Sequence, residues 1–182
     1  MERTRYILAQ RLLHWLIALL VLGMLTVGLV FMTLQYEGTV DAFGNEATNA
    51  LYTYHKTFGI LVLLLMLLRA LLRWAFPPPP YPVSLSPFER VASRTVHGLF
   101  YLLLIAMPLI GWAATAAGDY PVQFFNLTLP GLIAKDKELS QSLFQLHGAI
   151  GLLLILLILL HVAGALRHWG RGDAVMRRMS LP

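Results

Sequence analysis

The chain has 182 residues, of which 58% are hydrophobic and 13% are charged, and its formal net charge is +5. This composition is too apolar for an ordinary water-soluble domain. The absence of cysteine excludes cysteine-held iron–sulfur clusters, covalent c-type haem attachment and disulfides. The sequence also lacks the glycine-rich phosphate loops of soluble nucleotide-binding modules.

Four apolar segments follow one another along the chain, at about residues 13–33, 55–74, 95–117 and 144–168. Each reaches the ~20 residues that a helix needs to cross a bilayer core of ~30 Å. Their apolarity is continuous rather than alternating, which favours membrane helices over barrel strands. The sequence therefore predicts an all-α fold, an integral membrane up-down four-helix bundle that forms a single domain over residues 1–182.

The connections between these segments differ in character. Residues 34–54 and 118–144 are polar, with scattered glycine and asparagine, and are suited to short interfacial helices. The middle connection contains PPPPYP (Pro77–Pro82), and consecutive prolines end a helix and favour an extended, rigid spacer.

Basic residues are distributed unevenly between the two sides of this predicted bundle. One side receives eleven arginines: Arg3, Arg5, Arg11, Arg69, Arg73, Arg90, Arg94, Arg167, Arg171, Arg177 and Arg178. The other side receives only Lys56, Lys135 and Lys137. The positive-inside rule then places both termini in the cytoplasm. The basic excess is expected to contact anionic lipid, and nucleic acid is not an expected partner.

The six histidines can be assigned a depth, because the segments alternate in direction. His55 and His147 fall at the outer level, whereas His14, His97, His161 and His168 fall toward the inner level. His147 and His161 are separated by about 21 Å of helical rise and return to nearly the same helix face. One helix therefore offers an imidazole at each level, and each imidazole needs a partner at membrane depth.

Haem suits this pattern better than zinc. Zinc needs three or four ligands at one point, whereas haem needs two axial ligands and is readily held in a bundle core. Two histidine pairs at two depths predict two b haems. A porphyrin against a helix needs a small residue four positions after its ligand. Glycine or alanine follows four of the histidines at this spacing, and a tyrosine follows the fifth: His14–Ala18, His55–Gly59, His147–Gly151, His161–Ala165 and His97–Tyr101.

This comparison selects His14 rather than His97 as the partner of His161. The alternative for any single histidine is a hydrogen-bonded anchor at the membrane interface. For His97 and His168 that alternative remains the favoured interpretation.

Four segments carry a resemblance to a known family: RLLHWL (Arg11–Leu16), YHKTFGILVLLLMLLRALLR (Tyr54–Arg73), HGLFYLLLIAMPLIGW (His97–Trp112) and HGAIGLLLILLILLH with its extension GALRHW (His147–Trp169). In these features the chain resembles the bacterial cytochrome b561 family over nearly its whole length. The resemblance implies His14 and His161 as metal ligands of a cytoplasmic-side haem b. It implies His55 and His147 for a periplasmic-side haem b, in a multi-pass protein of the bacterial inner (plasma) membrane.

The resemblance also implies an electron-transfer function. Members of the family pass electrons between quinone and a second redox partner, and one activity among them is superoxide oxidase. The expected function is therefore an oxidoreductase that moves electrons between a periplasmic-side donor, superoxide or a redox protein, and the quinone pool, with ubiquinone as the bound substrate. The alternatives are an electron-transfer or anchor subunit of a larger respiratory dehydrogenase or hydrogenase, and a haem-free bundle.

Further candidate residues lie near the two histidine levels. Arg11, Arg73 and Lys56 are expected either to pair with haem propionates or to extend toward lipid headgroups. His97 and His168 are candidates for proton supply to quinone, and Lys56 is a candidate for attracting superoxide. Against superoxide, the outer surface has twice as many acids as lysines, and an anion is captured fastest by a positive surface.

Overall fold

The computed structural model describes residues 3–181, and its long elements are helices. Within the described residues, three helices are long and apolar enough to cross a membrane: α1 (Leu8–Ala75), α2 (Pro87–Ala117) and α3 (Lys137–Gly170). The prediction of a helical membrane protein is therefore confirmed at this level. The number of membrane crossings stays a prediction, because α1 contains two of the four predicted spans in one element.

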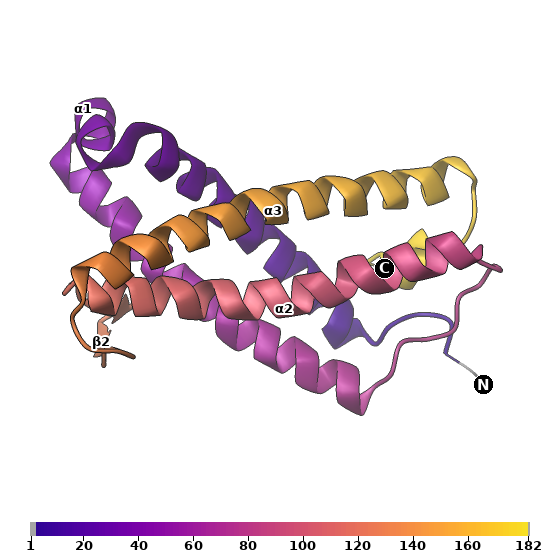
Figure 1. The fold of residues 1–182 in the computed structure, drawn as a ribbon. Helices are drawn as coiled ribbons and strands as arrows, with labels where there is room; N and C mark the ends of the chain where they lie inside the picture. The colour runs from indigo at the N-terminus through magenta and orange to yellow at the C-terminus, as the bar shows by residue number, and fades with distance from the viewer. Residues whose placement is uncertain (1–2, 182) are drawn as a thin grey trace.

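Helix α1 folds back on itself. Its 68 residues would measure about 100 Å if straight, but the backbone leaves helical conformation at Gln35 (φ 56°) and Gly44 (φ 80°). Contacts between the two limbs then pair residues in reverse order. The Gln10 amide donates to the Leu72 carbonyl at 3.1 Å, and Phe31 stacks on Tyr52 with ring centres 3.9 Å apart. Figure 1 shows the limbs meeting at one end of the molecule.

Helix α2 begins at a strong local signal. Ser86 accepts a hydrogen bond from the Glu89 amide, and the Glu89 carboxylate accepts one from the Ser86 amide, which is a capping box. Pro87 occupies the first helical position, where its missing N–H has no cost. The helix therefore starts eight residues before the predicted span at 95.

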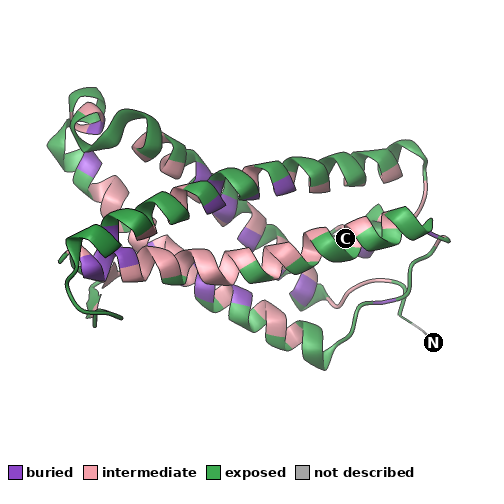
Figure 2. Cartoon of the chain, in the orientation of Figure 1, coloured by how far each residue is buried: buried purple, intermediate pink, exposed green. Residues whose placement is uncertain are grey.

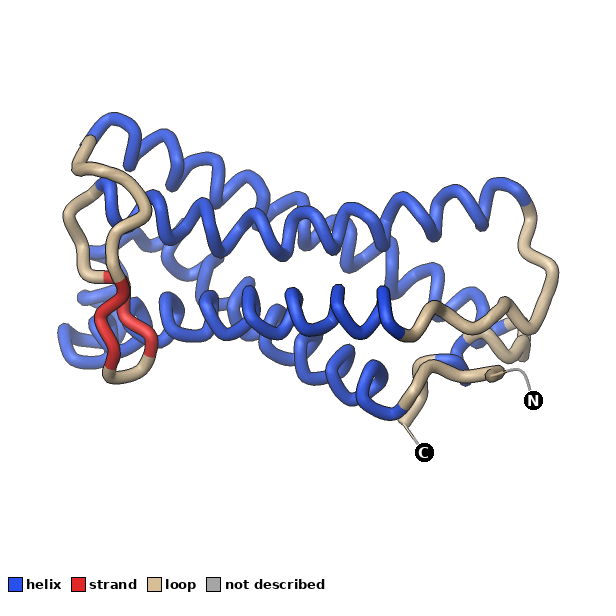
Figure 3. The backbone as a smooth tube through the Cα atoms, turned by 90° about the horizontal axis from the view of Figure 1, so that it is seen from below, coloured by secondary structure: helices blue, strands red, loops and turns tan. Residues whose placement is uncertain are grey.

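Helix α3 is also longer than its predicted span at 144–168. Asp136 caps its start by accepting from the Leu139 amide at 3.0 Å. The helix ends at Gly170, and Gly172 follows with φ +67°, a conformation that glycine adopts without steric cost. α2 and α3 lie side by side in Figures 1 and 3.

A short antiparallel hairpin closes the end of the bundle opposite the chain termini (Figure 3). Its strands are β1 (Val122–Phe124) and β2 (Leu127–Leu129), with Val122 paired to Leu129. Two side chains of α1 bind the hairpin backbone. Lys56 donates to the Pro121 carbonyl at 2.8 Å, and Thr57 donates to the Gln123 carbonyl at 3.3 Å. The hairpin was not predicted from the sequence.

The buried core runs along the axis where α1 and α3 meet, with partly buried α2 side chains packed against it. Its members are Leu13, Ile17, Val21, Leu25, Val62, Met66, Ile150 and Leu154. In the most apolar stretch of each long helix only 17% of the residues are buried (Figure 2). The remaining apolar faces need lipid, as expected of membrane helices.

Both termini lie at the same end of the molecule (Figure 3). Arg5 donates to the Ser180 carbonyl at 2.7 Å, and the Trp15 indole donates to the Met179 carbonyl at 3.0 Å. The tail carries a short 3-10 helix, η1 (Met176–Arg178), whose last residue is buried. The C-terminal tail is thus fastened to the first turns of α1.

Candidate haem-binding site

The outer histidine pair joins α1 and α3. The ring centres of His55 and His147 are 6.2 Å apart. His147 Nδ1 lies 3.1 Å from the Met107 carbonyl of α2. Since a carbonyl only accepts, Nδ1 carries the proton and Nε2 keeps a free lone pair. On His55, Nδ1 is buried and has no hydrogen-bond partner among the described residues. Both rings therefore retain a nitrogen available to a ligand.

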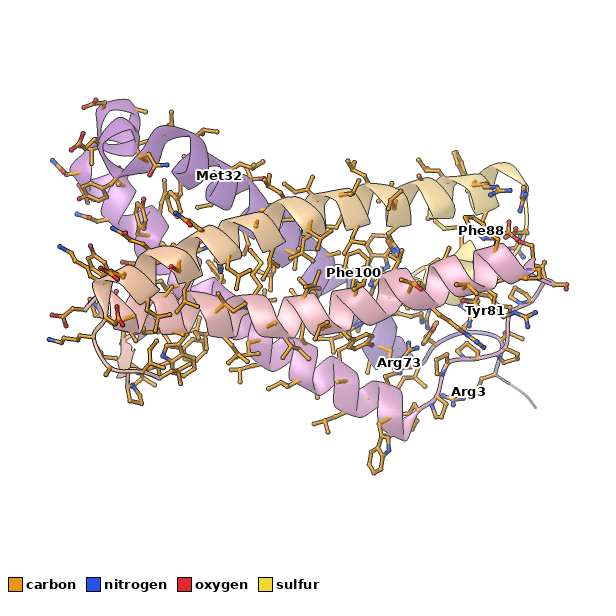
Figure 4. The ribbon with its side chains drawn as sticks, in the orientation of Figure 1. Arg3, Met32, Arg73, Tyr81, Phe88 and Phe100 are labelled. Carbon is orange, nitrogen blue, oxygen red and sulfur yellow. The ribbon has the colours of Figure 1, made fainter. Side chains whose placement is uncertain are left out.

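Three histidines gather at the inner level. The ring centre of His161 lies 6.2 Å from that of His14 and 5.3 Å from that of His97. His97 Nδ1 is engaged at 2.6 Å with the Ser93 carbonyl of its own helix. Phe100, labelled in Figure 4, packs its ring edge-on to His161 at 5.6 Å. The structure thus brings the predicted inner pair together and places His97 beside it.

The ring separations test whether these residues fit a haem. A metal–imidazole bond of about 2.0 Å and about 1.1 Å from nitrogen to ring centre put two rings on opposite faces of one ion about 6.2 Å apart. His14–His161 and His55–His147 both have this separation. His97–His161 is almost 1 Å shorter. The two predicted pairs fit axial ligation of one iron each, and His97 fits less well.

Glycines leave room around the outer pair. A Cβ added at Gly111 would lie only 3.0 Å from His147 Cε1, and one at Gly28 would lie 3.9 Å from His55 Cε1. Gly59 and Gly151, the predicted small neighbours, face the methyl groups of Met24 and Met107. Of these four glycines, Gly111 is therefore the one set most tightly against a histidine ring. Sequence spacing missed it, because it lies on α2, away from both histidines in the chain.

The remaining predicted residues occupy separate positions. Arg11 donates to the Ser180 carbonyl at 2.8 Å, and its Nε is buried without a partner among the described residues. Arg73 lies over the Tyr101 ring at 5.4 Å, at the end of the molecule that holds the termini (Figure 4). Lys56 binds the hairpin, as described above. His168 Nδ1 lies 2.7 Å from the Asp173 carboxylate.

Among residues 3–181, no group of three or more histidine, cysteine, aspartate or glutamate side chains converges on a point that could hold a metal ion. Asp173 was not predicted as a site residue, although the sequence places this carboxylate only five residues after His168.

Comparison with known proteins identifies the family of the chain. Residues 5–180 match the family model of prokaryotic cytochrome b561. Cytochrome b561 homolog 2 of Escherichia coli K12 is 32% identical over 165 residues, covering 90% of this chain and 84% of that protein.

Two more distant relatives cover most of the chain. A probable superoxide oxidase, CybB, of Yersinia pestis is 27% identical over 92% of this chain and 90% of its own length. Cytochrome b561 homolog 1 of Escherichia coli K12 is 22% identical over 96% of each chain. The chain therefore belongs to the prokaryotic cytochrome b561 family, membrane electron-transfer proteins for which the family implies haem b.

Proposed function

We propose that the chain binds two b haems, one between His55 and His147 and one between His14 and His161. In this proposal the protein moves electrons across the bacterial inner membrane, from a donor on the periplasmic side to the quinone pool. The observation that carries it is the equal 6.2 Å separation of the two pairs. About 21 Å of helical rise along α3 lies between the two levels.

The residues of the chain have defined parts in this proposal. Bound haem would supply reversible one-electron transfer at its iron. The Met107 carbonyl accepts the Nδ1 proton of His147 and orients the ring, which leaves Nε2 as the ligand nitrogen. Each pair takes one histidine from α1 and one from α3, so these two helices would hold each haem between them.

Haem stoichiometry is the decisive measurement. A pyridine haemochrome assay on protein purified in detergent is expected to give about two b haems per chain. His14→Ala and His55→Ala should each lose one of them, because each removes one axial ligand. His97→Ala is the matched control and should retain both. If His97→Ala loses a haem and His14→Ala does not, then His97 and not His14 is the partner of His161 in the inner pair.

The donor is the finer part of the proposal. A superoxide oxidase activity is supported by the relative of that name at 27% identity. The charges of the outer face favour a cationic or neutral donor instead, since Lys135 is already paired with Asp119 at 2.7 Å. Lys56 stays at the outer histidine level, with its ammonium on the Pro121 carbonyl. We infer that superoxide, if it is the donor, is attracted chiefly at Lys56.

This assignment is tested with superoxide generated in the presence of quinone. Lys56→Glu should slow superoxide oxidation and flatten its dependence on salt. Lys135→Glu serves as control, since its ammonium is already neutralised by Asp119. Equal rates of superoxide oxidation in wild type and Lys56→Glu would contradict this assignment. They would favour a protein donor, as in a subunit of a larger respiratory complex. Co-purification with a redox partner would then identify that second function.

A further inference from the structure

The last turn of α3 and the tail hold a histidine–carboxylate pair. His168 Nδ1 lies 2.7 Å from Asp173 Oδ2, and the two side chains are only 15% and 14% exposed. The second oxygen, Oδ1, accepts from the Val175 amide at 3.0 Å. Both carboxylate oxygens are thus used, and Asp173 is held in one orientation between the helix end and η1.

The neighbouring arginines pair with Glu89, so Asp173 pairs with His168. Arg171 is the other cation that acts on Asp173, and it donates to Glu89 of α2 at 2.7 Å. Arg167 also lies within 3.7 Å of the same Glu89 carboxylate. Glu89 therefore balances the two arginines at the end of α3. Burial alone would raise the pKa of the Asp173 carboxyl, but the hydrogen bonds from His168 and Val175, with Arg171 nearby, hold that pKa below its usual range.

The pair lies close to the inner histidine level. His168 follows His161 by seven residues, which in a helix is about 10 Å of rise and within about 20° of the same face. His168 therefore lies two turns beyond His161 on the same side of α3, toward the end where the termini meet. Since the carboxylate accepts the Nδ1 proton, Nε2 is the nitrogen free to face a substrate.

We propose that Asp173 is the positioning residue that holds His168 as the proton donor to quinone at the inner end of the bundle. This inference rests on the proposed function. The quinone takes two electrons, which originate in the one-electron donor of the outer side, and two protons. Each proton leaves Nε2 of the His168 imidazolium for a quinone oxygen and is replaced from cytoplasmic water. Asp173 stays ionised, keeps the Nδ1 proton and forms no bond to the substrate.

Asp173→Asn separates positioning from folding. The asparagine oxygen can still accept from the Val175 amide, so the start of η1 is retained. Its NH2 group then faces His168 Nδ1, which must become an acceptor, so the neutral ring moves its proton to Nε2. Asp173→Glu keeps the carboxylate. Asp119→Asn removes the same charge from an exposed ion pair at the opposite end and serves as the control.

The kinetic experiment mixes fully reduced protein with a water-soluble ubiquinone analogue and follows reoxidation. Positioned proton transfer contributes ~10²–10⁴-fold, so Asp173→Asn is expected to lower the rate at saturating quinone by about tenfold or more. The half-saturating quinone concentration and the haem content should stay within about twofold of wild type. Asp173→Glu should recover part of the rate, and Asp119→Asn all of it.

The second readout is independent of turnover. In protein labelled with ¹⁵N-histidine, the signal missing from His168→Gln identifies His168. Wild type should show a protonated Nδ1, and Asp173→Asn an unprotonated one.

An unchanged reoxidation rate in Asp173→Asn overturns the inference, and so does an unprotonated Nδ1 in wild type. If haem content and reoxidation rate fall by the same factor in both Asp173→Asn and Asp173→Glu, the carboxylate has a purely structural role. That result would also overturn the inference. Failure of the proposed function looks different, because wild type itself would then leave quinone unreduced.

Discussion

At the scale of single residues, Gly111 is the glycine with the least room beside the proposed haem ligands. A methyl group there would lie 3.0 Å from His147 Cε1 and 3.1 Å from Nδ1, so the ring would have to move away from the Met107 carbonyl. Overpacking of this kind costs about 1–3 kcal/mol. Gly111→Ala is therefore expected to lower the thermal midpoint of the protein in detergent and to reduce haem retention.

Gly98 provides the matched control for this substitution. It lies on the same helix, and no atom of the described residues would lie within 4 Å of its added Cβ. Gly98→Ala should leave haem content unchanged and, through helix propensity, stabilise by up to about 1 kcal/mol. Equal haem content in Gly111→Ala and Gly98→Ala would contradict the close fit of α2 against His147.

The Asp173 carboxyl predicts a pH dependence of stability. Its pKa in the folded protein lies below the usual range of an aspartate, because the hydrogen bonds from His168 and Val175 outweigh burial, which acts in the opposite direction. The ionised form is therefore favoured by folding, with His168 and Arg171 as the groups facing it. Its contribution is complete above the unfolded pKa and is lost as pH falls through the folded one.

The difference in thermal midpoint between wild type and Asp173→Asn measures this contribution. We expect the difference to be largest above about pH 5 and to shrink steadily toward pH 3. Asp119→Asn, which alters an exposed pair, should show little difference over the same range. A gap between wild type and Asp173→Asn that widens on acidification would contradict the assigned direction.

At the scale of elements, the reversal of α1 depends on two residues outside helical conformation. Gly44 has φ +80° and ψ 164°, a region that only glycine adopts readily, and its Cβ position is otherwise open. Gly44→Ala should therefore destabilise by about 1–3 kcal/mol through the backbone alone.

Gly23, in a helical stretch of α1 with equally open space, is the control. Gly23→Ala should not destabilise. Thermal unfolding in detergent checks both variants. Similar midpoints for the two would mean that the chain reverses direction elsewhere than at Gly44.

The predicted and observed elements differ where a helix start is marked by capping residues and where strands are very short. The capping box at Ser86 and Glu89 marks the true start of α2, but apolar content alone places the span at 95. Strands of three residues, as in β1 and β2, have too little pattern to be predicted. The proximity of His55 to His147 and of His14 to His161 follows from helix depth. Depth does not tell how each helix is rotated about its axis. The contact of His97 with His161 and the close approach of Gly111 to His147 depend on that rotation and could not be predicted.

At the scale of the whole molecule, the two ends of the bundle differ in how they are closed. At the hairpin end, α1 holds backbone carbonyls of residues 121 and 123. At the other end, Arg5, Arg11 and Trp15 all bind carbonyls of residues 177–180. The arginine-rich end is therefore the end at which the N- and C-terminal segments meet. A protein with both termini at one end crosses the membrane an even number of times.

This arrangement predicts the topology in the membrane. If α1 supplies two crossings and the arginine-rich end faces the cytoplasm, reporters at the C-terminus and in the Pro77–Pro82 connection should behave as cytoplasmic. A reporter placed after Lys135, beyond the hairpin, should behave as periplasmic. Fusions to green fluorescent protein and to alkaline phosphatase measure this, since the first fluoresces only in the cytoplasm and the second is active only in the periplasm.

A single crossing by α1 would instead put the C-terminus on the side opposite the N-terminus. A periplasmic C-terminus would therefore overturn either the four crossings or the predicted orientation. In both cases it would move the His168–Asp173 pair to the outer side, away from the cytoplasmic protons assigned to it.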